Sequence, residues 1–276
     1  MNYQQKIWKG TGVIIKSLFP LFLYIVIPGC LSVIGKFLRR FDGNTEAFLL
    51  ESGNFYQMLG TVICFLILRK SAKKRGNTLI KETTLDTENF DRKLALLYLG
   101  LGFFSALSIS ALITVLPLPA FLKQSYTESA SSIFQRTDLV LAVFNLLILA
   151  PVVEEMIFRG YMLNSLLSFF GEKAAVIISS GVFAACHVNL IWMIYAFAIG
   201  LILGRTAIKK DNILYGIVLH GGFNLFSAVN LVLLHTGLSE KLFFASRISV
   251  VLFGIVGILS VILIRRELAG REEWYL

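Results

Sequence analysis

Three short runs of the sequence combine acidic, basic, imidazole and amide side chains within otherwise apolar stretches. They are EEMIFRG at 154–160, FAACH at 183–187 and HGGFN at 220–224. A carboxylate can take a proton from water, and an imidazole and an amide can donate hydrogen bonds to a developing oxyanion. These residue types therefore suffice for hydrolysis of a peptide bond by an activated water molecule.

The two glutamates of the first run differ in their neighbours. Glu155 and Arg159 are four residues apart, so they share one face of a helix and are predicted to form an ion pair. Glu154 lies about 140° around the helix from Arg159 and has no counter-ion nearby in the sequence. We therefore expect Glu154 to accept the proton, with Glu155 and Arg159 acting as a brace. A pair of this kind can also fix helix register and do nothing else.

A spacing of four residues recurs in the other two runs. Phe183 and His187 share one helix face. His220 and Asn224 share another, which presents two hydrogen-bond donors on one side of that helix. Counted at 1.5 Å per residue, the glutamate and the two histidines lie roughly 14 to 21 Å from the inner ends of their segments. We therefore expect one polar cavity within the membrane, lined by Glu154, His187, His220 and Asn224. A lone histidine or asparagine in a membrane helix more often serves only as an interhelical hydrogen-bonding group.

Long apolar segments must position these side chains. Of the 276 residues, 56% are hydrophobic and 16% are charged, and the mean hydropathy is +0.75. In a soluble globular domain roughly a quarter of the residues are charged, and a disordered chain is far less apolar, so both classes are excluded. The apolar residues form continuous blocks, which favours membrane-spanning helices over the alternating pattern of an outer-membrane barrel.

Eight apolar segments are predicted to be transmembrane helices. They run over 13–34, 55–68, 94–116, 139–170, 174–187, 190–208, 213–234 and 242–264. We expect an all-α polytopic membrane helix bundle with about eight transmembrane helices. The whole chain, 1–276, should form a single membrane-embedded domain, with the catalytic helices at about 139–226.

Basic residues gather in one connecting segment and account for much of the net charge of +9. Eight of the 26 lysines and arginines lie in 69–93, which is typical of a cytoplasmic loop beside anionic lipid headgroups. No aromatic residues are interleaved with the basic run, so nucleic acid is not an expected partner. With both termini in the cytoplasm, 18 basic residues lie on the inner side and seven on the outer side. We expect a multi-pass protein of the cell membrane whose partners include membrane lipids.

In this order, and on separate apolar helices, the three runs resemble the motifs of the CPBP family of intramembrane proteases. This family is also called the Abi or CAAX-protease and bacteriocin-processing family. Its motifs are paired glutamates with an arginine four residues after the second, a phenylalanine four residues before a histidine, and a histidine four residues before an asparagine or a similar residue. The resemblance covers residues 139 to about 226. It implies an endopeptidase that hydrolyses hydrophobic or lipidated peptides within the membrane, such as prenylated CAAX ends.

The resemblance also implies roles for individual residues. Glu154 and His187 would hold and activate the attacking water. His220 and Asn224 would stabilise the tetrahedral oxyanion. Supporting roles fall to Glu155, Arg159 and Phe183. The reaction implied is based on glutamate, so neither a cofactor nor a metal ion is expected. The substrate stays open, because eukaryotic relatives trim prenylated ends and bacterial ones are associated with peptide processing and bacteriocin immunity.

Three other functions fit parts of the sequence. A zinc-dependent intramembrane protease would use His187, His220 and a glutamate as ligands, but the chain lacks an HExxH motif. A non-catalytic immunity or peptide-sensing protein would use the polar cluster only as architecture. A proton-coupled transporter is disfavoured because no internal repeat is visible. Chelation and substitution of Glu154 distinguish these functions from a glutamate-based protease.

Overall fold

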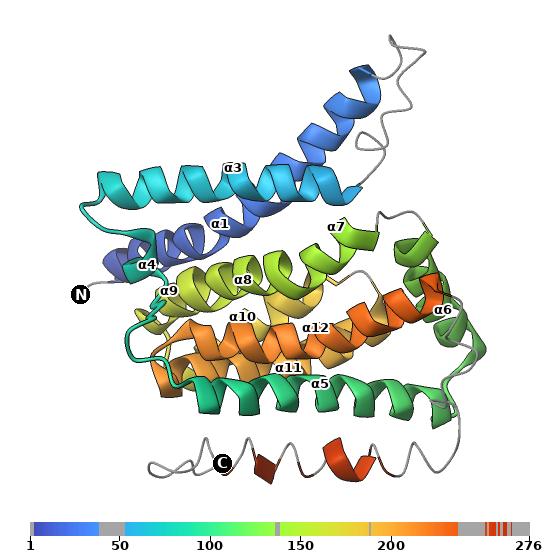
Figure 1. Ribbon diagram of the computed structural model, residues 1–276. Helices are drawn as coiled ribbons and strands as arrows, with labels where there is room; N and C mark the ends of the chain where they lie inside the picture. The colour runs from blue at the N-terminus through green and yellow to red at the C-terminus, as the bar shows by residue number, and fades with distance from the viewer. Residues whose placement is uncertain are drawn as a thin grey trace.

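The computed structural model describes residues 3–38, 53–135, 139–187 and 189–236, together with several positions between 252 and 266. Within these residues the chain is built from helices and the turns that join them (Figure 1). In chain order the helices are α1 (Tyr3–Leu38), α3 (Gly53–Lys74), α4 (Leu79–Glu82), α5 (Arg92–Val115), α6 (Ala120–Gln135), α7 (Leu139–Phe144), η2 (Asn145–Leu149), α8 (Ala150–Glu155), η3 (Met156–Leu163), α9 (Asn164–Leu167), α10 (Glu172–Ala185), α11 (Leu190–Lys210) and α12 (Ile213–His235). The stretches η2 and η3 are π-helical, with backbone hydrogen bonds between residues five apart.

Five of the described helices are long and apolar enough to cross a membrane. They cover Gly10–Phe37, Arg92–Ile113, Leu139–Leu167, Leu190–Lys210 and Ile213–Leu233. These spans correspond to five of the eight predicted segments, and the chain is a polytopic helical membrane protein. α3 and α10 occupy two more segments, but α3 is polar at both ends and α10 has only 14 residues, so the predicted count of eight is not confirmed. The last predicted segment, 242–264, lies mostly outside the described residues.

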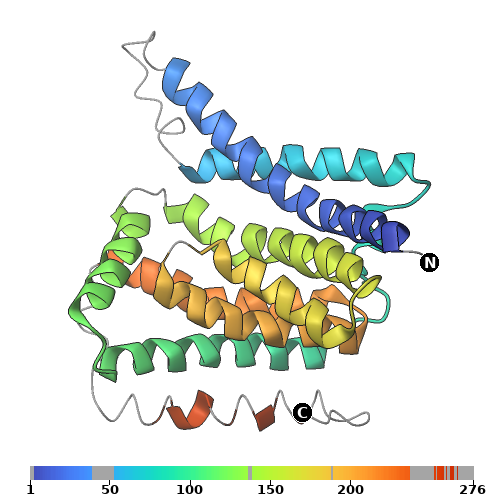
Figure 2. The ribbon, with the colours of Figure 1, turned by 180° about the vertical axis from the view of Figure 1, so that it is seen from behind.

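Two helices form the centre of the bundle: the helix that spans Leu139–Leu167, and α12. Five consecutive elements, α7, η2, α8, η3 and α9, make up the first of these, called the long helix below. α12 packs against α5, against α11 and against the long helix. α1 and α3 pair with each other and cover the long helix on the side away from α5 (Figures 1 and 2). The three polar runs of the sequence therefore lie on helices that contact one another.

The described part of the bundle is apolar outside and holds polar groups inside. Large apolar side chains face outward, including Val140, Leu96 and Ile194, which are 75%, 68% and 66% exposed. Lipid tails are as apolar as these side chains, so the outward faces suit a bilayer rather than water. By contrast, Glu155 and Arg159 are 0% and 1% exposed. These two charged side chains are thus held within the bundle and away from lipid.

α5 and α12 approach each other closely through glycine. A Cβ atom at Gly102 would overlap the carbonyl oxygen of Leu219, and a Cβ atom at Gly222 would overlap the carbonyl oxygen of Leu99. Small residues permit such backbone contact between membrane helices. The contact fixes the rotation of α12, so that the face carrying His220 is turned toward the long helix.

Alanine at either close-contact glycine should destabilise the protein. Gly102→Ala and Gly222→Ala each force two backbones apart, and we expect a cost of about 1–3 kcal/mol, as overpacking produces elsewhere. Gly100→Ala, on the same helix, is the matched control because a Cβ atom there meets nothing within 4 Å. Alanine favours a helix over glycine, so the control should be at least as stable as the wild type. Thermal unfolding in one detergent checks this order, and equal melting temperatures for the three variants would contradict it.

The basic connection between α3 and α5 folds against the end of the bundle where α12 begins. Asn212 exchanges two hydrogen bonds with Asp86: its Nδ2 donates to the Asp86 carbonyl at 2.7 Å, and its Oδ1 accepts from the Asp86 backbone N–H at 3.2 Å. Thr83 is fully buried and fills the space beside Gly160 of η3, where a Cβ atom would collide with it. The predicted polar loop is therefore an integral part of the bundle.

An ion pair within this loop joins it to the long helix. Arg75 donates from Nε to Glu82 Oε1 at 2.9 Å and from Nη2 to Glu82 Oε2 at 2.6 Å. Tyr161 of η3 donates its hydroxyl to the same Oε2 atom at 2.9 Å. These hydrogen bonds, above all those from Arg75, hold the pKa of Glu82 below its usual value.

Acid should remove the contribution of this carboxylate to stability. Because the pKa of Glu82 is lower in the folded protein than in the unfolded chain, its stabilisation is complete above the usual glutamate pKa of about 4.3 and is lost as the pH falls through the folded-state value. Glu82→Gln should lower the melting temperature at pH 7, and the difference from wild type should narrow below about pH 4. Glu88→Gln removes an exposed carboxylate of the same loop and controls for net charge. A difference that stays constant down to pH 3 would contradict the assignment.

Candidate active site

Glu155 is the acceptor at the centre of a buried cluster. Its Oε1 atom accepts a hydrogen bond from Arg159 Nη1 at 2.7 Å, and both side chains are 0% exposed. The ion pair predicted from the spacing of four residues is therefore present. Arg159 Nη2 donates to the Gly200 carbonyl of α11 at 3.2 Å, and the guanidinium carbon lies 4.6 Å from the centre of the Phe183 ring of α10. One side chain thus connects the long helix to two of its neighbours.

His220 of α12 lies between the two glutamates. Its Nδ1 atom is 3.1 Å from Glu155 Oε1, close enough for a proton on Nδ1 to be donated to that carboxylate. Its Nε2 atom is 3.8 Å from Glu154 Oε2, beyond direct hydrogen-bonding distance. Glu155 is therefore the residue that orients the imidazole, and Nε2 is the atom that His220 presents to Glu154.

The two neighbouring carboxylates differ in access. The Glu154 side chain is 20% exposed, whereas the Glu155 side chain is 0% exposed. Glu155 is engaged by Arg159 and His220. Glu154 lies within electrostatic reach of His220 and His187. Of the two carboxylates, Glu154 is the one that a small molecule can reach.

Phe183 holds both histidines of the cluster. The His187 ring meets it edge to face at a centroid distance of 5.0 Å, and the His220 ring does so at 5.7 Å. His187 Nδ1 lies 3.0 Å from the Phe183 carbonyl oxygen, an arrangement that suits a proton on Nδ1 and leaves Nε2 as the reactive nitrogen. Phe158 packs on the same phenylalanine at 5.1 Å. Phe183, to which the family resemblance gave a supporting role, thus packs against both imidazoles.

Asn224 lies one turn beyond His220 on α12, as expected, but its amide group has a partner within the protein. Its Nδ2 atom donates to the carbonyl oxygen of Leu146 at 3.0 Å. Leu146 belongs to η2, where the π-helical winding turns carbonyl groups away from their α-helical directions. One N–H of the Asn224 amide, which was expected to serve as a donor in the site, is therefore used to join α12 to the long helix.

Two further polar residues, Tyr24 and Gln57, lie outside the three motifs and are not predicted as site residues. Tyr24 of α1 forms a side-chain hydrogen bond with Gln57 of α3, and its hydroxyl lies within electrostatic reach of Glu154. Both residues are polar groups inside predicted apolar segments, which is the signal that identified the three motifs. They have no recognisable spacing from one another or from Glu154, so the sequence does not link them to the site.

Within the described ranges, no three His, Cys, Asp or Glu side chains are placed to share a metal ion. His187, His220 and a glutamate, the ligand set of the zinc alternative, are thus not arranged there as a metal centre. The Nδ1 atoms of both histidines face other partners, a carbonyl oxygen and a carboxylate. The arrangement consists of an accessible acid, Glu154, beside two imidazoles that other groups orient.

The fold and this cluster define a class of protein: a polytopic helical membrane protein with a glutamate–histidine centre between its helices. Residues 136–226 match the family model described as "Type II CAAX prenyl endopeptidase Rce1-like". The matched range agrees with the one over which the motif resemblance extends, and it contains all seven of the residues assigned to the site.

The chain is also similar in sequence to known proteins. The chain is similar to the UPF0177 protein YxdF of Lactococcus lactis subsp. lactis (strain IL1403), with 30% identity over 152 residues, which are 54% of this chain and 84% of that protein. It is 34% identical over 88 residues to an uncharacterized 24.3 kDa protein of Escherichia coli, a match that covers 30% of this chain and 41% of the relative. No solved structure shows significant similarity to this chain. The chain belongs to the CPBP, or CAAX-protease, family, as the resemblance of its motifs predicted.

Loss of the buried charge at Glu155 should destabilise the fold. Glu155→Gln leaves the Arg159 guanidinium without its counter-ion inside the bundle, and breaking a buried pair in this way costs on the order of 3–5 kcal/mol. Glu154→Gln, one residue earlier and partly exposed, is the matched control and should keep most of the wild-type stability. Thermal unfolding and the yield of folded protein in detergent are the measurements. Equal melting temperatures for the two variants would show that Glu155 is not the essential counter-ion.

Proposed function

We propose that this protein is an intramembrane endopeptidase that hydrolyses hydrophobic or lipidated peptides, with Glu154 as the residue that activates water. One observation carries the proposal. A partly exposed carboxylate, Glu154, lies 3.8 Å from the Nε2 atom of His220, whose Nδ1 atom is fixed by Glu155. Membership of the CAAX-protease family supports the same class of reaction.

The chemical steps follow from the roles of the acid and the imidazoles. A water molecule held by Glu154 and His187 loses a proton to the Glu154 carboxylate as its oxygen attacks the carbonyl carbon of the peptide. The carbonyl π electrons move to oxygen, and the resulting oxyanion accepts hydrogen bonds from His220 Nε2–H and from Asn224. When the tetrahedral intermediate collapses, the C–N bond breaks and Glu154 returns the proton to the leaving amine.

This scheme requires His220 to carry a proton on both ring nitrogens. Its Nδ1–H group is donated to Glu155, so a second proton on Nε2 makes the imidazole a cation and a charge-assisted donor to the oxyanion. The Glu155 carboxylate faces both Arg159 and His220 and supplies the negative charge that this cation needs. Glu155 is therefore a positioning residue in the proposal, and Glu154 is the base.

The surroundings of the cluster support a substrate taken from the membrane. The outward faces of the bundle expose large apolar side chains, so a peptide that reaches Glu154 comes from lipid or from an end of the helices. Prenylated CAAX-type peptides and other hydrophobic peptides meet this requirement. The basic loop of 69–93 lies at the end where α12 begins. Because basic loops are enriched on the cytoplasmic side of membranes, we propose that this end of the bundle faces the cytoplasm.

Replacement of Glu154 should abolish hydrolysis without loss of the fold. Glu154→Gln keeps the size of the side chain and removes the basic oxygen, so the rate should fall by about 10²-fold or more, the usual contribution of a general base. Cleavage of a farnesylated CAAX peptide by purified protein, with and without a chelator, is followed by mass spectrometry. The wild type should stay active in the chelator. Glu172→Gln, at an exposed position at the start of α10, is the matched control and should cleave at the wild-type rate.

Other outcomes of this experiment assign other functions. Activity that disappears with the chelator and returns with zinc would support the metal-dependent alternative. An active Glu154→Gln variant beside a folded, inactive Glu155→Gln variant would make Glu155 the catalytic carboxylate. If the wild type leaves the probe peptide intact, the peptides of cells expressing wild type or Glu154→Gln are compared by mass spectrometry. Identical peptide profiles would support a non-catalytic role in bacteriocin immunity or peptide sensing.

A further inference from the structure

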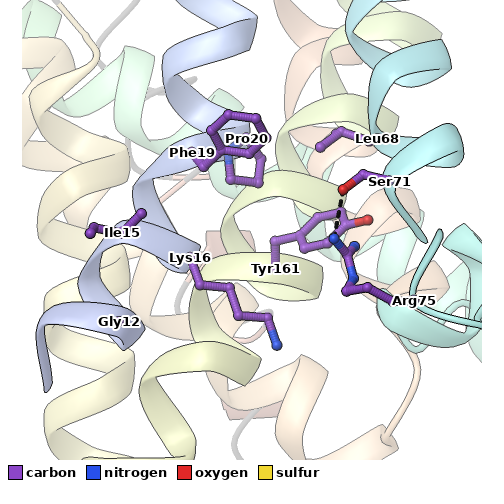
Figure 3. A pocket seen from close by; sticks show the side chains of 9 residues that line it. All are labelled: Gly12, Ile15, Lys16, Phe19, Pro20, Leu68, Ser71, Arg75 and Tyr161. Atoms are coloured by element: carbon purple, nitrogen blue, oxygen red, sulfur yellow. Dashed lines mark hydrogen bonds between the residues drawn. The ribbon is translucent and has the colours of Figure 1, made fainter. Parts of the chain in front are cut away.

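A pocket of about 290 Å³ lies between α1, the last turns of α3 and η3, at the basic end of the bundle (Figure 3). Its wall along α1 and α3 is apolar and includes Ile15, Phe19 and Leu68. Lys16 and Arg75 also line it, and both line an adjoining pocket of about 350 Å³ as well. The pocket therefore combines an apolar wall with two basic side chains.

The two basic side chains differ in their partners. Arg75 donates two hydrogen bonds to Glu82 and a third, from Nη1, to the Ser71 hydroxyl at 2.6 Å. Lys16 forms no hydrogen bond or ion pair among the residues that the structure describes, although its charge is attracted by the Glu82 carboxylate. Two cations and one carboxylate leave a formal charge of +1 at the pocket, which one anionic group would balance.

The depth of Lys16 restricts the kind of anion. The first span is Gly10–Phe37, so Lys16 is six residues, or about 9 Å of helix rise, inside it. A lysine at such a position needs an anionic partner or access to the membrane surface. Ile15 and Phe19, which belong to the same span, are 63% and 44% exposed. A ligand that touches both these side chains and Lys16 must have an anionic head and an apolar chain.

We propose that this pocket binds the phosphate of an anionic membrane phospholipid, with Lys16 as its cationic contact and the wall along α1 as the contact for an acyl chain. Figure 3 shows Lys16 of α1 and Arg75, in the turn that follows α3, on either side of the Tyr161 side chain. Tyr161 follows Glu154 by seven residues, about two helical turns, so the pocket is separate from the candidate active site. The proposal goes beyond the proteolytic function and needs no catalysis to be tested.

Binding is measured on the full-length protein in detergent, by native mass spectrometry with added phosphatidylglycerol or phosphatidylcholine. The wild type should bind phosphatidylglycerol more tightly. Lys16→Gln should weaken that binding about fivefold, the change expected when one basic residue facing anionic lipid is lost. Lys93→Gln is the matched control, because it removes a basic residue at the start of α5, away from α1 and α3, and it should bind as the wild type does. An equal loss in both variants would overturn the proposal.

A second pair of variants tests the pocket without changing charge. Gly12 lines the pocket, and a Cβ atom there meets nothing within 4 Å, so Gly12→Leu should fill space in the pocket without disturbing α1. Gly29→Leu places the same side chain at an equally open position on α1 that is not part of the pocket lining. We expect Gly12→Leu alone to weaken binding of phosphatidylglycerol. Unchanged binding by Gly12→Leu would overturn the proposal.

The same assay separates a lipid from a free phosphate. Glycerol 3-phosphate has the phosphate but no acyl chain, so it should not displace phosphatidylglycerol at matched concentrations. Displacement would show that the pocket takes a soluble phosphate and would overturn the assignment to lipid. Equal binding of phosphatidylcholine and phosphatidylglycerol by the wild type would show contact with acyl chains only, and would overturn it as well.

Discussion

A fully buried ion pair organises this bundle. Charges taken out of water must be compensated by close partners, because the interior of a protein screens them weakly. Arg159 meets this requirement with the Glu155 carboxylate on its own helix, a carbonyl oxygen of α11 and the ring of Phe183 on α10. Glu155 in turn receives His220 from α12. The long helix, α10, α11 and α12 thus meet around one guanidinium and one carboxylate.

The same constraint separates the two glutamates. Neighbouring residues on a helix point about 100° apart, so a carboxylate fixed toward the interior leaves the preceding one directed elsewhere. Glu155 is enclosed on the α12 side as well, since a Cβ atom at Gly216 would come within 3.1 Å of its Oε2 atom. Glu154 keeps partial exposure and lies near the Nε2 atom of His220. A pair of identical residues in the sequence therefore occupies two different environments.

Spacing in the sequence was sufficient for contacts within one helix and insufficient for contacts between helices. Glu155 and Arg159 are four residues apart on the long helix and meet as predicted. Phe183 and His187 also meet, but α10 ends at Ala185, so His187 follows the helix and does not lie on the shared helix face that the spacing predicts. The contact of His220 with Glu155 could not be predicted in the same way, because it depends on how α12 is rotated by its close packing on α5. The bond from Asn224 to Leu146 depends on a π-helical stretch, for which residue types give no signal. Apolar segments located the helices, but their polar ends and lengths decide which of them can cross a bilayer, so the number of spans was the least predictable feature.

The two π-helical stretches affect how this chain is compared with its relatives. A π-helical turn holds about one residue more than an α-helical turn, so such a stretch can take up an inserted residue while the flanking turns keep their places. At either stretch, a relative whose long helix is α-helical throughout would match this chain only across a one-residue gap. That gap would record a local change of winding acquired during divergence, and residues on its two sides would still be structurally equivalent.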